Sequence, residues 1–223
     1  MELTYSRFFE KALELTKISP EKFKKQYAEL ELRTLKGEIS NENYQITAKK
    51  LLGNPGMTKK ELENIVSLCW GSQVDDAVKL KKRIYDKGSC LGIFSNMNQF
   101  AWEYLSKKYL EMLKTYNSES PIIYSYLVKD VKPKLPMYKK AQKFAKENKI
   151  TNTILIEDKE SYLIPGIENF GWKGVLFTPY VDNAEAIRSA SGHDDRTKPR
   201  KNFKIANSIN ELENALISFG VEV

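Results

Sequence analysis

Apolar side chains recur every three or four residues through the first 70 residues, which is the spacing of amphipathic helices. Two helix start signals support this pattern: Ser19-Pro20-Glu21 offers an N-cap followed by proline, and Thr58 with Glu61 forms a capping box. We therefore expect an N-terminal α-helical region, which we assign to residues 1–78. The apolar positions that carry the pattern are Phe8, Ala12, Leu15, Phe23, Tyr27, Leu30, Leu62, Ile65, Val66, Cys69 and Trp70.

From Cys90 onward, short apolar runs alternate with amphipathic helical segments. This alternation predicts βα units, and hence an α/β fold with a doubly wound parallel sheet, over residues 79–223. Residues 178–202 are polar and irregular, and they are too many for an ordinary loop, so we expect an exposed excursion there. The runs expected as strands are residues 91–94, 122–128, 153–157, 175–178 and 203–206.

The overall composition narrows the class of protein. With 223 residues, of which 41% are hydrophobic, the chain can bury one substantial core, or a core domain and a smaller one. No apolar run approaches the roughly 18 residues of a membrane span, and the N-terminus lacks the apolar centre of a signal peptide. We expect a soluble, cytoplasmic protein. Cys69 and Cys90 lie in segments patterned as buried helix and buried strand, so both are expected to be core residues in a reducing compartment.

Several classes of site are excluded by residues that the sequence lacks. A single histidine, His193, and the lack of C-x-x-C argue against a His/Cys zinc site, and no P-loop, dinucleotide-binding glycine fingerprint or G-x-S-x-G elbow occurs. The net charge of +7 permits anionic ligands, but 36 basic and 29 acidic residues are interspersed. Because no basic platform interleaved with aromatic residues is present, nucleic acid is not expected as a partner.

Groups suited to phosphoryl chemistry follow three successive predicted strands. Ser95 and Asn96 enter a turn before a helix, Lys132 precedes a proline, and Glu157 is followed by Asp158. Ligands of open parallel sheets bind at the carboxyl ends of the strands. Taken singly, these residues are also ordinary turn and capping residues. In this order, however, they offer a hydroxyl and an amide for phosphate oxygens, a fixed cation, and two carboxylates of the kind that hold Mg²⁺.

These segments resemble three motifs of the haloacid dehalogenase (HAD) superfamily of hydrolases. The run IFSNMNQFAWEYL is similar to the second motif, with Ser95, Asn96 and Asn98 in the matching positions. The run DVKPKLPMYKKA is similar to the third motif and places Lys132. The run TILIEDKESYLIPGIENFGWKGVLF is similar to the fourth motif and places Glu157 and Asp158. The helical N-terminal region resembles the α-helical cap of one branch of the superfamily.

The resemblance implies a Mg²⁺-dependent phosphatase that acts on a small phosphorylated metabolite. Ser95 and Asn96 would bind the phosphate, with Ser95 and Lys132 as the catalytic residues. Lys132 would stabilise the phosphoryl charge, and Glu157 with Asp158 would hold the metal. A 2-haloacid dehalogenase-type hydrolase on the same scaffold stays open as an alternative activity. Assembly into a homo-oligomer is also left open.

The chain departs from the family at the first motif, a strand that ends in D-x-D-x-T and supplies the aspartate nucleophile. No segment matches it, and the cap pattern begins almost at Met1, so we expect that the first catalytic strand is missing and that turnover is little or none. Glu157 also stands where the family has aspartate. Three interpretations remain: a protein that starts upstream, a catalytically silent relative, and a shell that binds an acidic partner through Lys79–Arg83 and Lys198–Lys201.

Overall fold

The computed structural model describes residues 5–116, 119–180 and 201–223. The chain divides into two compact units. The described residues within Met1–Gln73, Phe94–Leu113 and Tyr124–Val131 form the first unit, and those within Val74–Ile93, Lys114–Ile123 and Lys132–Val223 form the second. The domain boundary expected at residue 78 stays a prediction. Most of the excursion expected over residues 178–202 lies outside the described residues, because 181–200 are not described.

The first unit is helical, as the three- and four-residue spacing predicted. Ser19 accepts a hydrogen bond from the backbone N–H of Lys22, and both halves of the capping box between Thr58 and Glu61 are formed. Both predicted start signals are therefore confirmed, whereas the role of this unit as a cap stays a prediction. Its helices are α1 (Tyr5–Leu15), α2 (Pro20–Leu35), α3 (Asn41–Leu51), α4 (Lys59–Val66), the 3₁₀ turn η1 (Ser67–Cys69), α6 (Gln99–Lys108), α7 (Leu110–Leu113) and α8 (Ser125–Val128).

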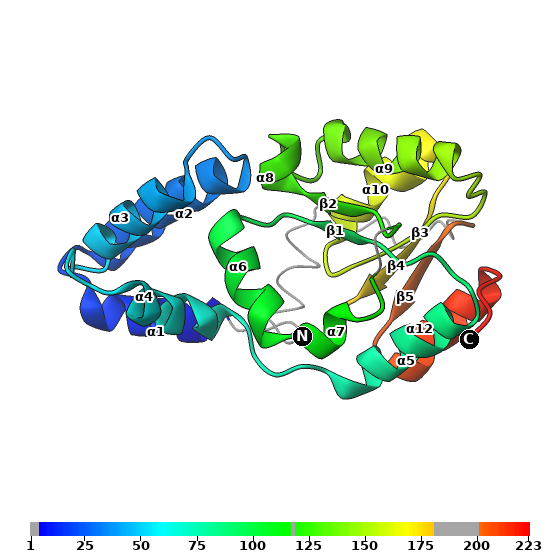
Figure 1. Cartoon of the computed structure of the whole chain (residues 1–223), viewed down its shortest axis with the longest axis horizontal. Coiled ribbons are helices and arrows are strands. Elements are labelled where there is room, and N and C mark those ends of the chain that lie inside the picture. The colour runs from blue at the N-terminus through cyan, green and yellow to red at the C-terminus, as the bar shows by residue number, and fades with distance from the viewer. Residues whose placement is uncertain (1–4, 117–118, 181–200) are drawn as a thin grey trace. The chain divides into compact units, whose positions relative to one another are not determined.

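Aromatic side chains fill the core of the first unit. The Tyr27 ring lies 4.7 Å from that of Phe8 and 5.7 Å from that of Phe23. Its hydroxyl is 3.3 Å from the hydroxyl of Tyr44, and burial raises the pKa of both tyrosines. Helices α2 and α3 lie side by side, as do α1 and α4, because each contributes an apolar stripe to this core (Figure 1).

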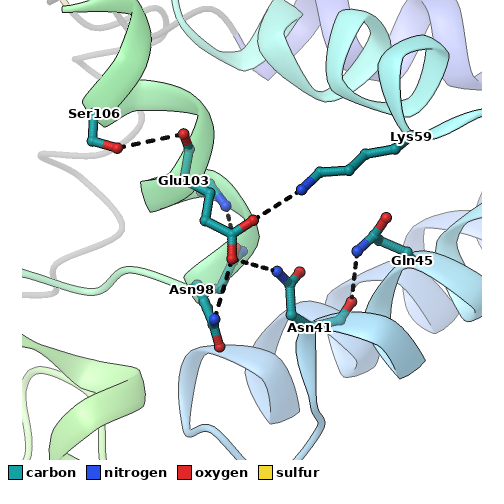
Figure 2. A network of polar contacts seen from close by, with 8 residues as sticks. Asn41, Gln45, Lys59, Asn98, Glu103 and Ser106 are labelled. Atoms are coloured by element: carbon teal, nitrogen blue, oxygen red, sulfur yellow. Dashed lines mark hydrogen bonds and ion pairs between the residues drawn. The ribbon is translucent and has the colours of Figure 1, made fainter. Parts of the chain in front are cut away.

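A polar network ties α6 to α3 and α4 within the first unit (Figure 2). One carboxylate oxygen of Glu103 on α6 accepts hydrogen bonds from the side-chain amides of Asn41, at 2.8 Å, and Gln99, at 3.1 Å. The other oxygen accepts one from Lys59 Nζ at 3.0 Å. These donors lower the pKa of Glu103 against the opposing effect of its partial burial. One half-buried anion, the carboxylate of Glu103, thus holds together three helices that are distant in sequence.

The second unit is built on a parallel sheet of three strands in the order β3 (Ile154–Glu157), β4 (Lys173–Phe177) and β5 (Phe203–Ala206). Val175 and Ala206 pack on one face with α5 (Asp75–Asp86) and α12 (Ile209–Ser218), whereas Gly174 meets Leu163 of α10 (Glu160–Phe170) on the other. Helix α9 (Leu135–Glu147) lies beside α10 (Figure 1). Helices on both faces of a parallel sheet confirm the predicted doubly wound α/β fold.

Two further strands, β1 (Ile93–Ser95) and β2 (Ile122–Tyr124), form a separate two-stranded sheet. The strand expected over residues 122–128 is therefore wrong in its second half, because residues 125–128 form α8. The physical reason lies in Ser125, which is fully buried and whose hydroxyl accepts from the backbone N–H of Met97 and donates to its carbonyl, both at 3.0 Å. This polar anchor turns the chain where the apolar run alone suggested continued strand.

The two cysteines do not share the same environment. Cys69 is buried in the core of the first unit, as expected. Cys90 is exposed, so its expected place in a buried strand is wrong, because β1 begins only at Ile93. Among the residues that the structure describes, no helix combines the length and the apolar character needed to cross a membrane.

Candidate active site around Lys132

Lys132 carries its charge into the interior of the second unit. It lies in the loop before α9, and only 4% of its side chain is exposed. Its Nζ contacts the Oε1 atom of Glu157, whose side chain is 9% exposed. The ring of Tyr162 lies 4.9 Å from the same ammonium group. Because a buried charge is stable only when it is paired, the Lys132–Glu157 contact is the electrostatic centre of this site.

The end of β3 positions the acidic side of the site. Glu157 is the last residue of β3 and pairs in register with Leu176 of β4, which is buried. Asp158 follows at once, and its backbone N–H donates to the Oε2 atom of Glu157 at 3.3 Å. The hydroxyl of Tyr138 on α9 donates a hydrogen bond of 2.6 Å to the backbone carbonyl of Tyr162 and so holds Tyr162 in place. The strand end and the first turn of α10 thus converge on Lys132.

The electrostatics of Lys132 are set by opposing effects. Burial lowers the pKa of Lys132 to about 7, because removal from water disfavours the charged form. The negative charge of Asp158 raises this pKa, and the positive charge of Lys159 lowers it. A lysine poised in this way depends on a nearby anion to stay charged at neutral pH.

The expected phosphate-binding residues lie in the first unit. Ser95 ends β1, and its hydroxyl donates to the carbonyl of Asn96 at 3.4 Å. Asn98 is buried and caps α6, because its Oδ1 atom accepts a hydrogen bond of 2.7 Å from the backbone N–H of Ala101. Ser95 and Asn96 are half-buried. The structure thus brings together Lys132, Glu157 and Asp158 within the second unit, and the phosphate-binding role of Ser95 and Asn96 stays a prediction.

Two residues of these segments were not singled out by the sequence pattern. Ser125 anchors the Met97 backbone in the turn that follows Ser95 and Asn96. Tyr162 places its ring over Lys132. The only signal for Ser125 is a hydroxyl residue inside an apolar run, and that for Tyr162 is a tyrosine one turn after an acidic pair.

Solved structures provide the comparison that identifies the fold. A HAD family enzyme from Bacteroides thetaiotaomicron, crystallised as a magnesium complex, aligns with 88% of this chain and 90% of its own, with a TM-score of 0.64 and 16% identity. A second structure of that enzyme aligns over 83% and 92%, with a TM-score of 0.67 and 18% identity. A predicted HAD-like family hydrolase from Porphyromonas gingivalis aligns over 78% and 83%, with a TM-score of 0.62 and 12% identity.

The chain has the HAD-like hydrolase fold. This likeness rests on structure, since no protein-family model and no curated protein matches the sequence. The expectation drawn from the three sequence motifs is confirmed at the level of the fold.

Glu157 and Asp158 are the acidic residues of this site that Mg²⁺ would need. Mg²⁺ is usually held by one or two carboxylates together with water and substrate phosphate. Glu157 and Asp158 supply two carboxylates at the end of β3, although Glu157 already contacts Lys132. Within the described residues, no group of three or more His, Cys, Asp or Glu side chains gathers to hold a metal, at this site or at another. Two carboxylates are therefore enough for a Mg²⁺ ion that keeps several water ligands. Asp158 is the better ligand of the two, because Glu157 already contacts Lys132.

Proposed function

We propose that this chain carries a phosphate-binding site of the Mg²⁺-dependent phosphatase type, for small phosphorylated metabolites. The observation that carries the proposal is Lys132, a buried cation at the carboxyl end of β3 in contact with Glu157 and beside Asp158. In a site shielded from water, an ammonium group attracts a phosphoryl anion far more strongly than it would in solvent. The magnesium complex of the Bacteroides thetaiotaomicron enzyme supports the assignment of the metal.

Each residue in the proposal has one role. In the first unit, Ser95 and Asn96 would receive phosphate oxygens through a hydroxyl, an amide and the backbone N–H groups of the turn, a role that is separate from the proposal for the second unit. Lys132 would offset the phosphoryl charge. Asp158 and Glu157 would hold Mg²⁺, which, when bound, supplies further positive charge to the phosphoryl oxygens.

The proposal does not include efficient hydrolysis of the bound phosphate ester. No segment of its 223 residues matches the motif that supplies the aspartate nucleophile. We therefore expect phosphate binding with little or no hydrolysis. A catalytically silent binding protein is the second candidate, and the contact between Glu157 and Lys132 favours it, because that contact occupies a carboxylate that the metal would use.

Thermal unfolding with inorganic phosphate and MgCl₂ tests the proposal. Phosphate and Mg²⁺ together should raise the melting temperature, since a ligand that binds only the folded state stabilises it. Asp158→Asn should abolish the part of the rise that requires Mg²⁺, while the matched exposed control Asp86→Asn should leave it unchanged. A wild-type protein that phosphate does not stabilise would refute the site assignment. Phosphate release from a panel of phosphomonoesters then separates an active phosphatase from a silent relative.

A further inference from the structure

The positive charge of the chain is concentrated on one segment. Residues 129–149 contain eight lysines and two acidic residues, Asp130 and Glu147, an excess of six positive charges in a chain whose net charge is +7. Four of these lysines lie on α9 and are exposed. Helix α9, with four lysines and one glutamate, carries half of this excess, so it is a place where an anionic partner would be attracted.

The other basic run, on α5, is neutralised within the chain. Lys79 pairs with Asp76 at 3.0 Å, and Lys82 pairs with Asp86 at 2.6 Å. Arg83 makes a bidentate pair with Glu213 of α12, at 3.1 and 2.6 Å. The acidic-partner interpretation based on residues 79–83 therefore loses its support. Its second run, Lys198–Lys201, lies mostly outside the described residues.

The lysines of α9 are not neutralised in this way. Lys139 and Lys146 have no ion pair with any residue that the structure describes, and Lys143 has only an exposed contact of 3.7 Å with Glu147 one turn away. Lys139, Lys143 and Lys146 share one face of the helix, because they are four and three residues apart. This face presents three cations against a single described counter-charge, the exposed carboxylate of Glu147.

This lysine face borders a groove of about 360 Å³, which Gln142, Phe170 and one carboxylate, that of Glu147, also line. Gln142 is fixed, because its Oε1 atom accepts a hydrogen bond of 2.6 Å from Trp172 Nε1. With the carbonyl oxygen used, its amide group is left to donate. The ring of Phe170 packs against Trp172, with 5.6 Å between the ring centroids. The groove thus combines three cations, one carboxylate, an oriented donor and one aromatic ring, and this net positive lining suits an anion that also carries an apolar group.

An extended acidic peptide matches this groove better than a small molecule or a nucleic acid does. Lys139 and Lys146 are separated by about 10 Å along the helix axis, which three residues of extended chain span. The groove is open to solvent along its length, so it would leave much of a small ligand in water. Single-stranded nucleic acid is bound on several stacked rings, whereas Phe170 is the one aromatic side chain that lines this groove.

We propose that the α9 groove docks an extended acidic segment of a partner protein, with carboxylates on Lys139, Lys143 and Lys146 and an apolar side chain on Phe170. The proposal is independent of phosphate binding at Lys132.

Fluorescence anisotropy tests it with the whole chain and a labelled peptide rich in Glu and Asp that carries one Phe. Lys139→Gln/Lys143→Gln/Lys146→Gln should weaken binding by about tenfold or more, from three partly screened ion pairs. The matched control Lys79→Gln/Lys81→Gln/Lys82→Gln removes the same charge from α5 and should change the affinity less than about twofold.

Three outcomes would overturn the proposal. They are no binding of the acidic peptide at low salt, an equal loss of affinity in the α5 control, and tighter binding of a single-stranded oligonucleotide than of the peptide. Replacing the peptide's Phe with Ser should also weaken binding, and an unchanged affinity would refute the role of Phe170. Circular dichroism of both triple variants shows that they are folded before binding is compared.

Discussion

Replacing Glu157 with Gln is the sharpest test of the buried pair. The substitution keeps the volume of the side chain but leaves the Lys132 ammonium, 4% exposed, without its contacting carboxylate. Removing one partner of a buried ion pair costs about 3–5 kcal/mol, because the remaining charge is desolvated and uncompensated. The nearby charge of Asp158 offsets part of this loss, so the lower end of that range is expected. Urea unfolding followed by circular dichroism measures the change.

The pH dependence of this variant has a defined sign. In the folded wild type, burial lowers the pKa of Lys132 to about 7, below its value in the unfolded chain. The unfolded state then binds more protons between these two pKa values, so this group makes the folded state more stable as pH rises through that window. The loss in Glu157→Gln should therefore be larger at about pH 6 than at about pH 9, because Lys132 can shed its charge at the higher pH.

Two further variants check this reasoning. Lys132→Met/Glu157→Leu removes both charges and should recover most of the stability, since a buried pair is often replaceable by apolar residues. Glu147→Gln breaks the exposed pair with Lys143 and should change stability by at most about 0.5 kcal/mol. If Glu157→Gln is no more destabilising than Glu147→Gln, the Lys132–Glu157 contact is not a buried ion pair and the site must be redrawn.

Two other substitutions test the packing of each unit. Gly166→Ala would place a Cβ atom 2.5 Å from the ring of buried Trp172. The steric overlap should outweigh the roughly 1 kcal/mol gained in helix propensity. We expect a net loss of about 1–2 kcal/mol in the free energy of unfolding, measured in urea. Glu103→Ala removes the acceptor of the hydrogen bonds from Asn41 and Lys59. It should lower the free energy of unfolding by about 1 kcal/mol, and by less at high salt. An unchanged midpoint of unfolding would show that the network is solvated.

Much of the fold follows from local patterns. The capping signals at Ser19 and Thr58 predicted helix starts that the structure has, because capping depends only on neighbouring residues. The expected strand over 122–128 failed where Ser125 is bound by Met97, a contact between residues far apart in sequence. A short apolar run cannot by itself distinguish strand from helix. The exposure of Cys90 was missed for a similar reason, since the start of β1 is set by pairing with β2.

The candidate site was predictable in its residues but not in its contacts. The rule that ligands bind at strand ends singled out Lys132, Glu157 and Asp158 from the sequence. It could not show that Glu157 contacts Lys132, since that depends on how the loop before α9 packs on the end of β3. Likewise, the sequence offered the basic run on α5 as a surface for an acidic partner, whereas the structure shows Arg83 paired with Glu213. Charge patterns in sequence do not reveal which charges are already neutralised.

The buried lysine links the stability of the chain to its proposed function. A cation as enclosed as Lys132 needs an anion in either state of the site, and Glu157 supplies it when no ligand is bound. If phosphate reaches this lysine, it can take over as the counter-charge and should stabilise Glu157→Gln more than the wild type, because the variant has more to regain. If phosphate instead stabilises neither protein, Lys132 and Glu157 form a structural pair, and the phosphate site is not at the end of β3.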